Sequence, residues 1–304
     1  MINGIINVHK EAGFTSFDVV AKLRGITKIR KIGHTGTLDP DATGVLPVCI
    51  GTATKLCDML TDKTKEYEAT FRLGITTDTQ DISGKVLHEK EVDITQDKLE
   101  QCIMSFIGKQ QQIPPMYSAI KINGQKLYDL ARAGKEVERE PRDIEITDIE
   151  IVEILHENES DSEICTGAVI KVCCSKGTYI RTLCNDIGQK LGCGATMTKL
   201  VRTRSGQFNL DNALTLAQIE EIFHADESGD SVSKIVIPVD MVFKEYQAVT
   251  VSDEQEKRVL NGNFIRNNYL GERIRVYLSD GCFAAVYEFS EESGYYKPYK
   301  MFLS

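Results

Sequence analysis

Residues 31–47, KIGHTGTLDPDATGVLP, are the most informative stretch of this 304-residue chain. Glycines, one histidine and two aspartates are followed directly by an apolar run. Glycine loses more conformational entropy on folding than any other residue, so a glycine-rich loop indicates an unusual turn or a close approach of backbone. We therefore predict a loop over 31–44 and a buried strand over 45–51.

Three chemistries compete for this loop. A phosphate-binding loop is disfavoured because no Gly-Lys-Ser/Thr follows. A calcium loop is imitated by Asp39, Asp41 and Thr43, but the twelfth position is Ile50 in place of glutamate. The third is a carboxylate held at a rigid turn as a nucleophile or general base. The alternative, that both aspartates only cap turns, stays open on this loop alone.

Outward from the loop, hydrophobic periodicity predicts an α/β (α+β) chain. The strands expected from sequence are 2–8, 45–51, 66–74, 84–92, 143–155 and 167–176, and the helices are one capped by Ser16, a short one at 54–61, 95–107 with Thr95 as cap, 178–192, and 215–223.

Residues 108–142 are rich in proline, tyrosine and basic side chains, and they predict a long functional loop around a short helix at 126–133. Residues 227–233, ESGDSVS, form the best linker candidate. A β-rich tail then covers 244–304. We expect a catalytic domain over 1–240 around a mixed, largely antiparallel sheet. Its cleft lies between the 31–44 loop and the helix at 178–190.

We expect a cytoplasmic protein. No run approaches the ~18 apolar residues of a membrane span, and the N-terminus lacks a secretory pattern. The nine cysteines are irregularly spaced without a Cys-x-x-Cys, which favours reduced, mostly buried thiols over disulfides or zinc. We expect no metal and no cofactor.

The net charge of −9 is unevenly distributed. Segment 165–210 has seven Lys/Arg against one Asp/Glu, whereas 143–164 has none against nine. Segments 1–65 (nine against six) and 109–142 (seven against four) are also basic. Alternating basic and acidic segments are what one positive face on an acidic protein produces, and chance clustering explains them equally well on charge alone.

Three further segments accompany the loop: KEYEATFRLG (65–74), SKGTYIRTLCNDIG (175–188) and LVRTRSGQF (200–208). Together with GHTGTLDPDATG they resemble the bacterial tRNA pseudouridine-55 synthase family, the TruB type, over essentially the whole chain. The resemblance implies an isomerase that flips a uridine out of the tRNA T-loop and reattaches its base through carbon.

The resemblance implies a role for three catalytic residues. Asp39 is the nucleophile, attacking either the uracil ring or the anomeric carbon. Tyr67 stacks on the flipped uracil and removes the C5 proton. Arg181 pairs with Asp39 and keeps it ionised, because a neighbouring cation lowers a carboxylate pKa.

Substrate-binding residues follow by the same resemblance. Tyr179 and Leu200 line the uracil pocket, and His34 fills the gap that the flipped base leaves. Lys10 lies near the pocket or at a phosphate, and Arg202 and Arg204, beside Lys199, hold phosphates.

Partners are likewise implied by the family. Residues 108–142 match an insertion that clamps the T-arm, and 244–304 match a small PUA-like domain that touches the acceptor stem. We expect a monomer without a protein partner. Two other functions compete: an RNA-folding protein without catalysis, and a glycosidase, which needs a second carboxylate such as Asp41 beside Asp39.

Overall fold

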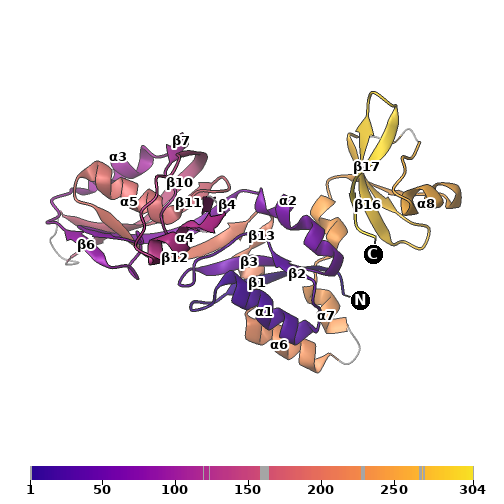
Figure 1. Cartoon of the computed structure of the whole chain (residues 1–304), viewed down its shortest axis with the longest axis horizontal. Coiled ribbons are helices and arrows are strands. Elements are labelled where there is room, and N and C mark those ends of the chain that lie inside the picture. Colours follow the sequence, from indigo (N-terminus) through magenta and orange to yellow (C-terminus); the bar gives the residue numbers. More distant parts are fainter. Residues whose placement is uncertain are drawn as a thin grey trace.

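A nine-stranded sheet forms the centre of the computed structural model, which describes residues 2–118, 120–122, 124–157, 164–226, 230–266, 269 and 271–303 (Figure 1). Its strands are β1 (Gly4–Lys10), β2 (Ile32–His34), β3 (Thr43–Ile50), β4 (Lys65–Leu73), β7 (Gly108–Gln112), β10 (Arg142–His156), β11 (Cys165–Cys174), β12 (Ala195–Ser205) and β13 (Phe208–Asn209).

The main strand order is β1-β3-β12-β4-β11-β10-β7, with β2 beside β3 and β13 beside β12. The pairs are antiparallel except β3 with β12, which run parallel over two residue pairs, Thr43–Val201 and Gly44–Arg202. The expected mixed, largely antiparallel sheet is therefore confirmed. The short parallel contact joins the N-terminal strands to the rest of the sheet.

Helices cover the two halves of the sheet separately. Helices α1 (Ser16–Thr27), α6 (Leu216–Ala225) and α7 (Asp230–Ile235) gather against β1 and β3, where their apolar side chains share one buried cluster (Figure 1). Helices α3 (Gln96–Met104) and α5 (Ile180–Leu191) pack on β4, β10, β11 and β12. α5 ends at Gly192, whose left-handed φ of 83° suits glycine.

Shorter elements complete this part of the chain. They are the 3-10 helix η1 (Gly51–Leu56), α2 (Cys57–Thr61), the hairpin β5 (Ile75–Thr77) with β6 (Val86–Glu89), the hairpin β8 (Lys121–Ile122) with β9 (Gln125–Lys126), α4 (Leu127–Arg132) and η2 (Leu210–Asn212). The 108–142 segment thus contains β7, β8, β9 and α4, and β7 forms an edge of the large sheet.

The C-terminal region has its own sheet, of strands β14 (Gln247–Thr250), β15 (Arg273–Tyr277), β16 (Phe283–Ser290) and β17 (Tyr295–Met301), with α8 (Asp253–Leu260) (Figure 1). The expected β-rich tail is confirmed. It contacts the first sheet through an apolar cluster in which Phe243, from η3 (Val239–Phe243), and Phe302 pack with Ile5 and Phe208.

Several local expectations differ from the structure. Helix α1 is capped by Thr15 in place of Ser16, because Thr15 and Asp18 form a reciprocal capping box. Residues 32–34 are a strand within the expected loop. Of the expected linker, residues 230–233 begin α7 and the remainder lies outside the described residues.

Two further features concern the cysteines and the lengths of the helices. All nine cysteines are free, and six of them are buried. Within the described ranges, no helix is long and apolar enough to span a membrane.

Candidate active site

The loop that connects β2 to β3 carries Asp39, and β12 fixes the end of this loop. Gly44 has a φ of 108°, and a Cβ built on it lies 2.2 Å from the backbone oxygen of Arg202. Only glycine allows this approach, which brings β3 and β12 into their short parallel pairing. The glycine-rich sequence therefore serves a close backbone contact.

Arg202 is buried beneath the loop, with 1% of its surface exposed. Its Nε donates to the Val45 carbonyl at 2.6 Å, and its Nη atoms donate to the carbonyls of Thr37 at 3.4 Å and Gly36 at 3.3 Å. The expectation that Arg202 holds a phosphate is wrong, because the guanidinium is out of reach of solvent. It fastens the loop.

Lys10 fastens the same loop from β1. It is fully buried, and its Nζ donates to the carbonyls of Ala42 at 2.6 Å, Pro40 at 2.9 Å and Glu11 at 3.0 Å. Burial lowers the pKa of Lys10 to about 8, while the charge of Asp39 opposes this shift. Lys10 therefore lies close to the site, as expected, but not where a phosphate could contact it.

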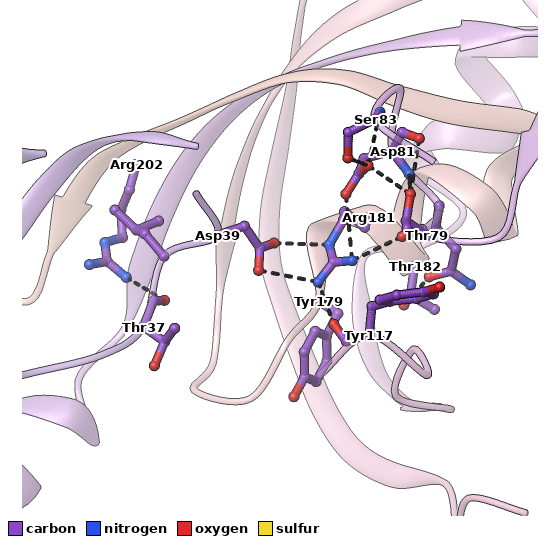
Figure 2. A network of polar contacts seen from close by, with 12 residues as sticks. Thr37, Asp39, Thr79, Asp81, Ser83, Tyr117, Tyr179, Arg181, Thr182 and Arg202 are labelled. Carbon is purple, nitrogen blue, oxygen red and sulfur yellow. Dashed lines mark hydrogen bonds and ion pairs between the residues drawn. The ribbon is translucent and has the colours of Figure 1, made fainter. Parts of the chain in front are cut away.

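Asp39 faces Arg181 in a side-on ion pair. The Arg181 Nε lies 2.9 Å from Oδ2 of Asp39, and Nη2 donates to Oδ1 at 3.3 Å (Figure 2). Two parallel contacts fix the carboxylate rotamer as well as its charge. The Asp39 side chain stays 41% exposed, so a substrate can reach it.

Arg181 is itself held by two other segments. It is 4% exposed, and it donates from Nη1 to the Thr79 carbonyl and from Nη2 to the Tyr117 carbonyl, both at 2.9 Å (Figure 2). Its Nη1 also lies 3.5 Å from Oδ2 of Asp81. Asp81 in turn accepts from the hydroxyls of Ser83 at 2.6 Å and Thr79 at 2.7 Å. The guanidinium thus joins the 108–142 segment and the turn after β5 to Asp39.

The pKa of Asp39 does not follow the expected direction. Burial raises the pKa of this carboxyl above its ordinary value, and the negative charge of Asp81 adds to the rise, whereas Arg181 and Lys10 lower it. Arg181 therefore limits a shift that burial imposes, and the net pKa is not lower than usual.

Tyr67 lies on β4 directly across from Arg202 on β12. Residues paired in this way point to the same face of the sheet. Burial raises the pKa of Tyr67, and Arg202 opposes that rise. The phenol is therefore protonated at neutral pH, which suits a stacking surface and hydrogen-bond donor. Removal of the C5 proton by Tyr67 stays a prediction.

Tyr179 lies at the start of α5, the helix that carries Arg181, and Leu200 lies on β12. Tyr179 precedes α5, and its ring lies beside Asp39 and Arg181 in Figure 2. Its backbone nitrogen donates to Oε1 of Gln112 at 2.8 Å, and its carbonyl accepts from Nε2 of Gln112 at 3.0 Å. Leu200, on β12, is 8% exposed and belongs to the core below.

His34 occupies the opposite end of the loop. It ends β2, pairs with Val48, and is half-buried, so the expected exposed loop position is corrected. Burial lowers the pKa of His34, and the nearby Arg202 cation lowers it further. The imidazole is therefore neutral at neutral pH. Its ring meets the ring of Phe17 edge to face, with 5.3 Å between the two ring centroids.

Arg204 does not line the site. A bulge between Arg202 and Arg204 sets Arg204 opposite Glu66, the neighbour of Tyr67 on β4. Successive strand residues point to opposite faces, so Arg204 lies on the face away from Tyr67. There its Nη2 approaches Oε2 of Glu66 at 3.5 Å. Its expected place beside the pocket wall is wrong.

Sequence reasoning missed the residues that hold Arg181 and Tyr179. These are Thr79 and Asp81, which lie between the strands expected at 66–74 and 84–92, and Gln112 and Tyr117, which lie in the long loop expected over 108–142. An aspartate pair within the turn-rich 76–84 was the available signal, and it is weak, because aspartate is common in turns.

This arrangement presents one reachable carboxylate, a rigid cation behind it, and aromatic rings around it. Asp81 is engaged by Arg181, Thr79 and Ser83, so it does not supply the free acid that a glycosidase pair requires, and a pairing of the exposed Asp41 with Asp39 stays a hypothesis. In the part of the chain that the structure describes, no group of three His, Cys, Asp or Glu could hold a metal ion. Nucleophilic attack by Asp39 is the chemistry that the geometry favours.

Comparison with known proteins agrees with this chemistry. Residues 24–180 match the TruB family pseudouridylate synthase N-terminal domain, and residues 181–244 match the tRNA pseudouridylate synthase B C-terminal domain. A protein named tRNA pseudouridine synthase B from Lachnoclostridium phytofermentans is 51% identical, over 99% of this chain and 100% of its own. One of the same name from Alkaliphilus oremlandii is 46% identical, over 91% and 90% of the two chains.

Solved structures share the fold. A chain in the crystal structure of a Cbf5-Nop10-Gar1 complex is 27% identical with a TM-score of 0.72, covering 99% of this chain and 85% of that one. A chain in an H/ACA RNP bound to a substrate RNA containing 2'-deoxyuridine is 24% identical with a TM-score of 0.71 and the same coverage, which shows the fold alone. The fold and the site define the class as pseudouridine synthases, which are isomerases. The chain belongs to the TruB family of pseudouridylate synthases.

Proposed function

We propose that this protein converts uridine 55 in the T-loop of tRNA into pseudouridine. The observation that carries the proposal is the ion pair of Asp39 with Arg181, which holds one reachable carboxylate in a single orientation. Relatives that cover almost the whole chain are named tRNA pseudouridine synthase B, which supports tRNA as the substrate.

In the proposed mechanism, the target uridine leaves the RNA stack and enters beside Asp39. The carboxylate attacks the ring or the anomeric carbon, the glycosidic bond breaks, and the base turns and rejoins the ribose through C5. The C5 proton then leaves, N1 takes up a proton, and the bond to Asp39 breaks, which restores the carboxylate. The reaction is an isomerisation, so atoms balance without an added reactant.

Other side chains take supporting parts. Tyr67 stacks on the uracil and accepts the C5 proton after its own phenol proton has passed to water, while Tyr179 and Leu200 form the pocket walls. His34 fills the space that the uridine leaves in the RNA. Residues 108–142 clamp the T-arm, and Tyr117 within them bonds Arg181, so RNA contact with this segment reaches the site.

We further propose a cytoplasmic monomer of two units. The catalytic unit covers 1–240, and a PUA-like unit over 244–304 touches the acceptor stem. Its separate four-stranded sheet supports this division.

An unmodified tRNA transcript with tritium at C5 of its uridines tests the function. Pseudouridine formation releases tritium to water, and mapping of the product should find a single modified position in the T-loop. A transcript whose T-loop uridine is replaced by cytidine should release none. Absence of release from the first transcript, or release from both, would contradict the proposal.

A further inference from the structure

Phe17 is an exposed aromatic residue that the fold does not need. It is 72% exposed, the highest value among the large apolar side chains of the described residues. Helix α1 buries Ser16, Val19, Val20 and Leu23 on its other side. An exposed phenyl ring contributes little to folding, so its surface is available for contact with another molecule.

The start of α1 is fastened to the loop on both sides of Asp39. The Leu38 nitrogen donates to Oγ of the buried Ser16 at 2.9 Å, and the Gly13 nitrogen donates to the Pro40 carbonyl at 3.0 Å. Phe17, next to Ser16, therefore has a fixed position at the edge of the loop that carries Asp39.

Phe17 and His34 form an aromatic ridge. Their ring centroids are 5.3 Å apart with the planes at 89°. Because burial and Arg202 lower the pKa of His34, both rings are uncharged at neutral pH. The perpendicular contact uses only one edge of the pair, so most of the phenyl surface stays available.

The surroundings of the ridge favour a nucleobase over an apolar protein surface. Next to Phe17 on α1, Asp18, Ala21 and Lys22 are exposed, so no continuous apolar patch extends from it. A single aromatic ring in a polar setting suits an unpaired base, whose π-face stacks while its phosphate stays in water.

We propose that Phe17 stacks on an unpaired nucleobase of the substrate RNA, beside the nucleotide that enters the Asp39 site. The inference rests on the proposed RNA substrate and adds a contact on the α1 side of the loop. It makes Phe17 a substrate-binding residue and not a catalytic one.

Binding of a T-arm stem-loop RNA to Phe17→Ala, Phe17→Tyr and Phe17→Leu tests the proposal. Stacking of a base on an aromatic ring is worth ~1–3 kcal/mol, so we expect the alanine variant to bind about 5- to 100-fold more weakly. The tyrosine variant should stay within about threefold of wild type, and the leucine variant should resemble alanine.

Leu87→Ala is the matched control, because Leu87 is 54% exposed on the remote hairpin strand β6; it should bind as wild type does. Wild-type affinity of Phe17→Ala, or full rescue by leucine, would overturn the stacking contact. If wild type binds RNA and depends on Phe17 but forms no pseudouridine, the proposed reaction fails and the contact stands. If pseudouridine forms and Phe17→Ala binds normally, only the contact fails.

Discussion

At the scale of single residues, Asp39 combines a reachable position with a fixed orientation. Asp39→Asn keeps the side-chain shape but replaces the nucleophile with a neutral amide. We expect pseudouridine formation to be abolished, while tRNA affinity stays within about tenfold, or ~1.4 kcal/mol, because the RNA contacts lie elsewhere. Tritium release and filter binding measure the two quantities. Turnover at the wild-type rate would remove Asp39 from the mechanism.

The pH dependence should report the Asp39 carboxyl. Attack requires the ionised form, and burial raises the pKa of Asp39. Activity should therefore fall with decreasing pH at a higher pH than an ordinary aspartate would give, which is about 3.9. The measurement is kcat/KM across the acid range, with circular dichroism to show that the protein stays folded. Constant kcat/KM down to the ordinary aspartate pKa would contradict this prediction.

Tyr67 separates stacking from proton transfer. Tyr67→Phe keeps the ring and loses only the phenol oxygen, so turnover should fall much more than affinity. Tyr67→Leu should lower both, because base–aromatic stacking is worth ~1–3 kcal/mol. Single-turnover rates and binding constants distinguish the two. Unchanged turnover in Tyr67→Phe would assign the C5 proton to another group or to water.

At the scale of elements, one bulge in β12 gives two similar arginines different environments. Arg202 is buried under the loop carbonyls, whereas Arg204 meets Glu66 on the other face of the sheet. Arg202→Met should leave the carbonyls of Gly36, Thr37 and Val45 without their cationic donor. We expect a loss of about 1–3 kcal/mol in the free energy of unfolding for the buried Val45 carbonyl alone, because it is left without a donor, together with loss of turnover.

Arg204→Met is the control for this comparison. Its ion pair with Glu66 is partly exposed, and such pairs contribute at most about 1 kcal/mol. Urea unfolding of both variants measures the difference. Equal losses would show that Arg202 does not hold the loop.

The contrast also marks where prediction from sequence ended. Hydrophobic patterns gave the main strands and helices, and the resemblance brought Asp39, Tyr67, Arg181 and Tyr179 to one site, but a period of two places Arg202 and Arg204 on the same face. The bulge between them places the two side chains on opposite faces of the sheet. The sequence VRTRS contains no residue that predicts a bulge. Thr79 and Tyr117 contribute backbone carbonyls to Arg181, which side-chain identity cannot reveal.

At the scale of the whole molecule, a net charge of −9 has to coexist with RNA binding. Basic side chains that contact phosphates should still displace the counterions bound to the RNA. The affinity for tRNA should therefore fall steeply with salt, with a slope of log K against log salt of about −0.7 per phosphate neutralised. Changing the exposed Lys121 and Lys135 of the 108–142 segment to glutamine should make that slope shallower by about 1 to 1.5.

Lys85 and Lys98 are the matched control, because they are equally exposed but lie in the acidic 66–108 segment. Their replacement by glutamine should leave the slope unchanged. An affinity that does not depend on salt, or equal effects of the two double variants, would remove the 108–142 segment from the RNA contact.

The bond from Arg202 to the Val45 carbonyl joins residues 157 positions apart. Contacts this distant form late, because the intervening chain must close before the contact can stabilise it. During synthesis, the ribosome releases the Asp39 loop long before the arginine that secures it, and Arg181 also follows well after. An unfinished chain therefore carries Asp39 without its support, and we expect catalytic competence only once β12 has emerged and joined the sheet.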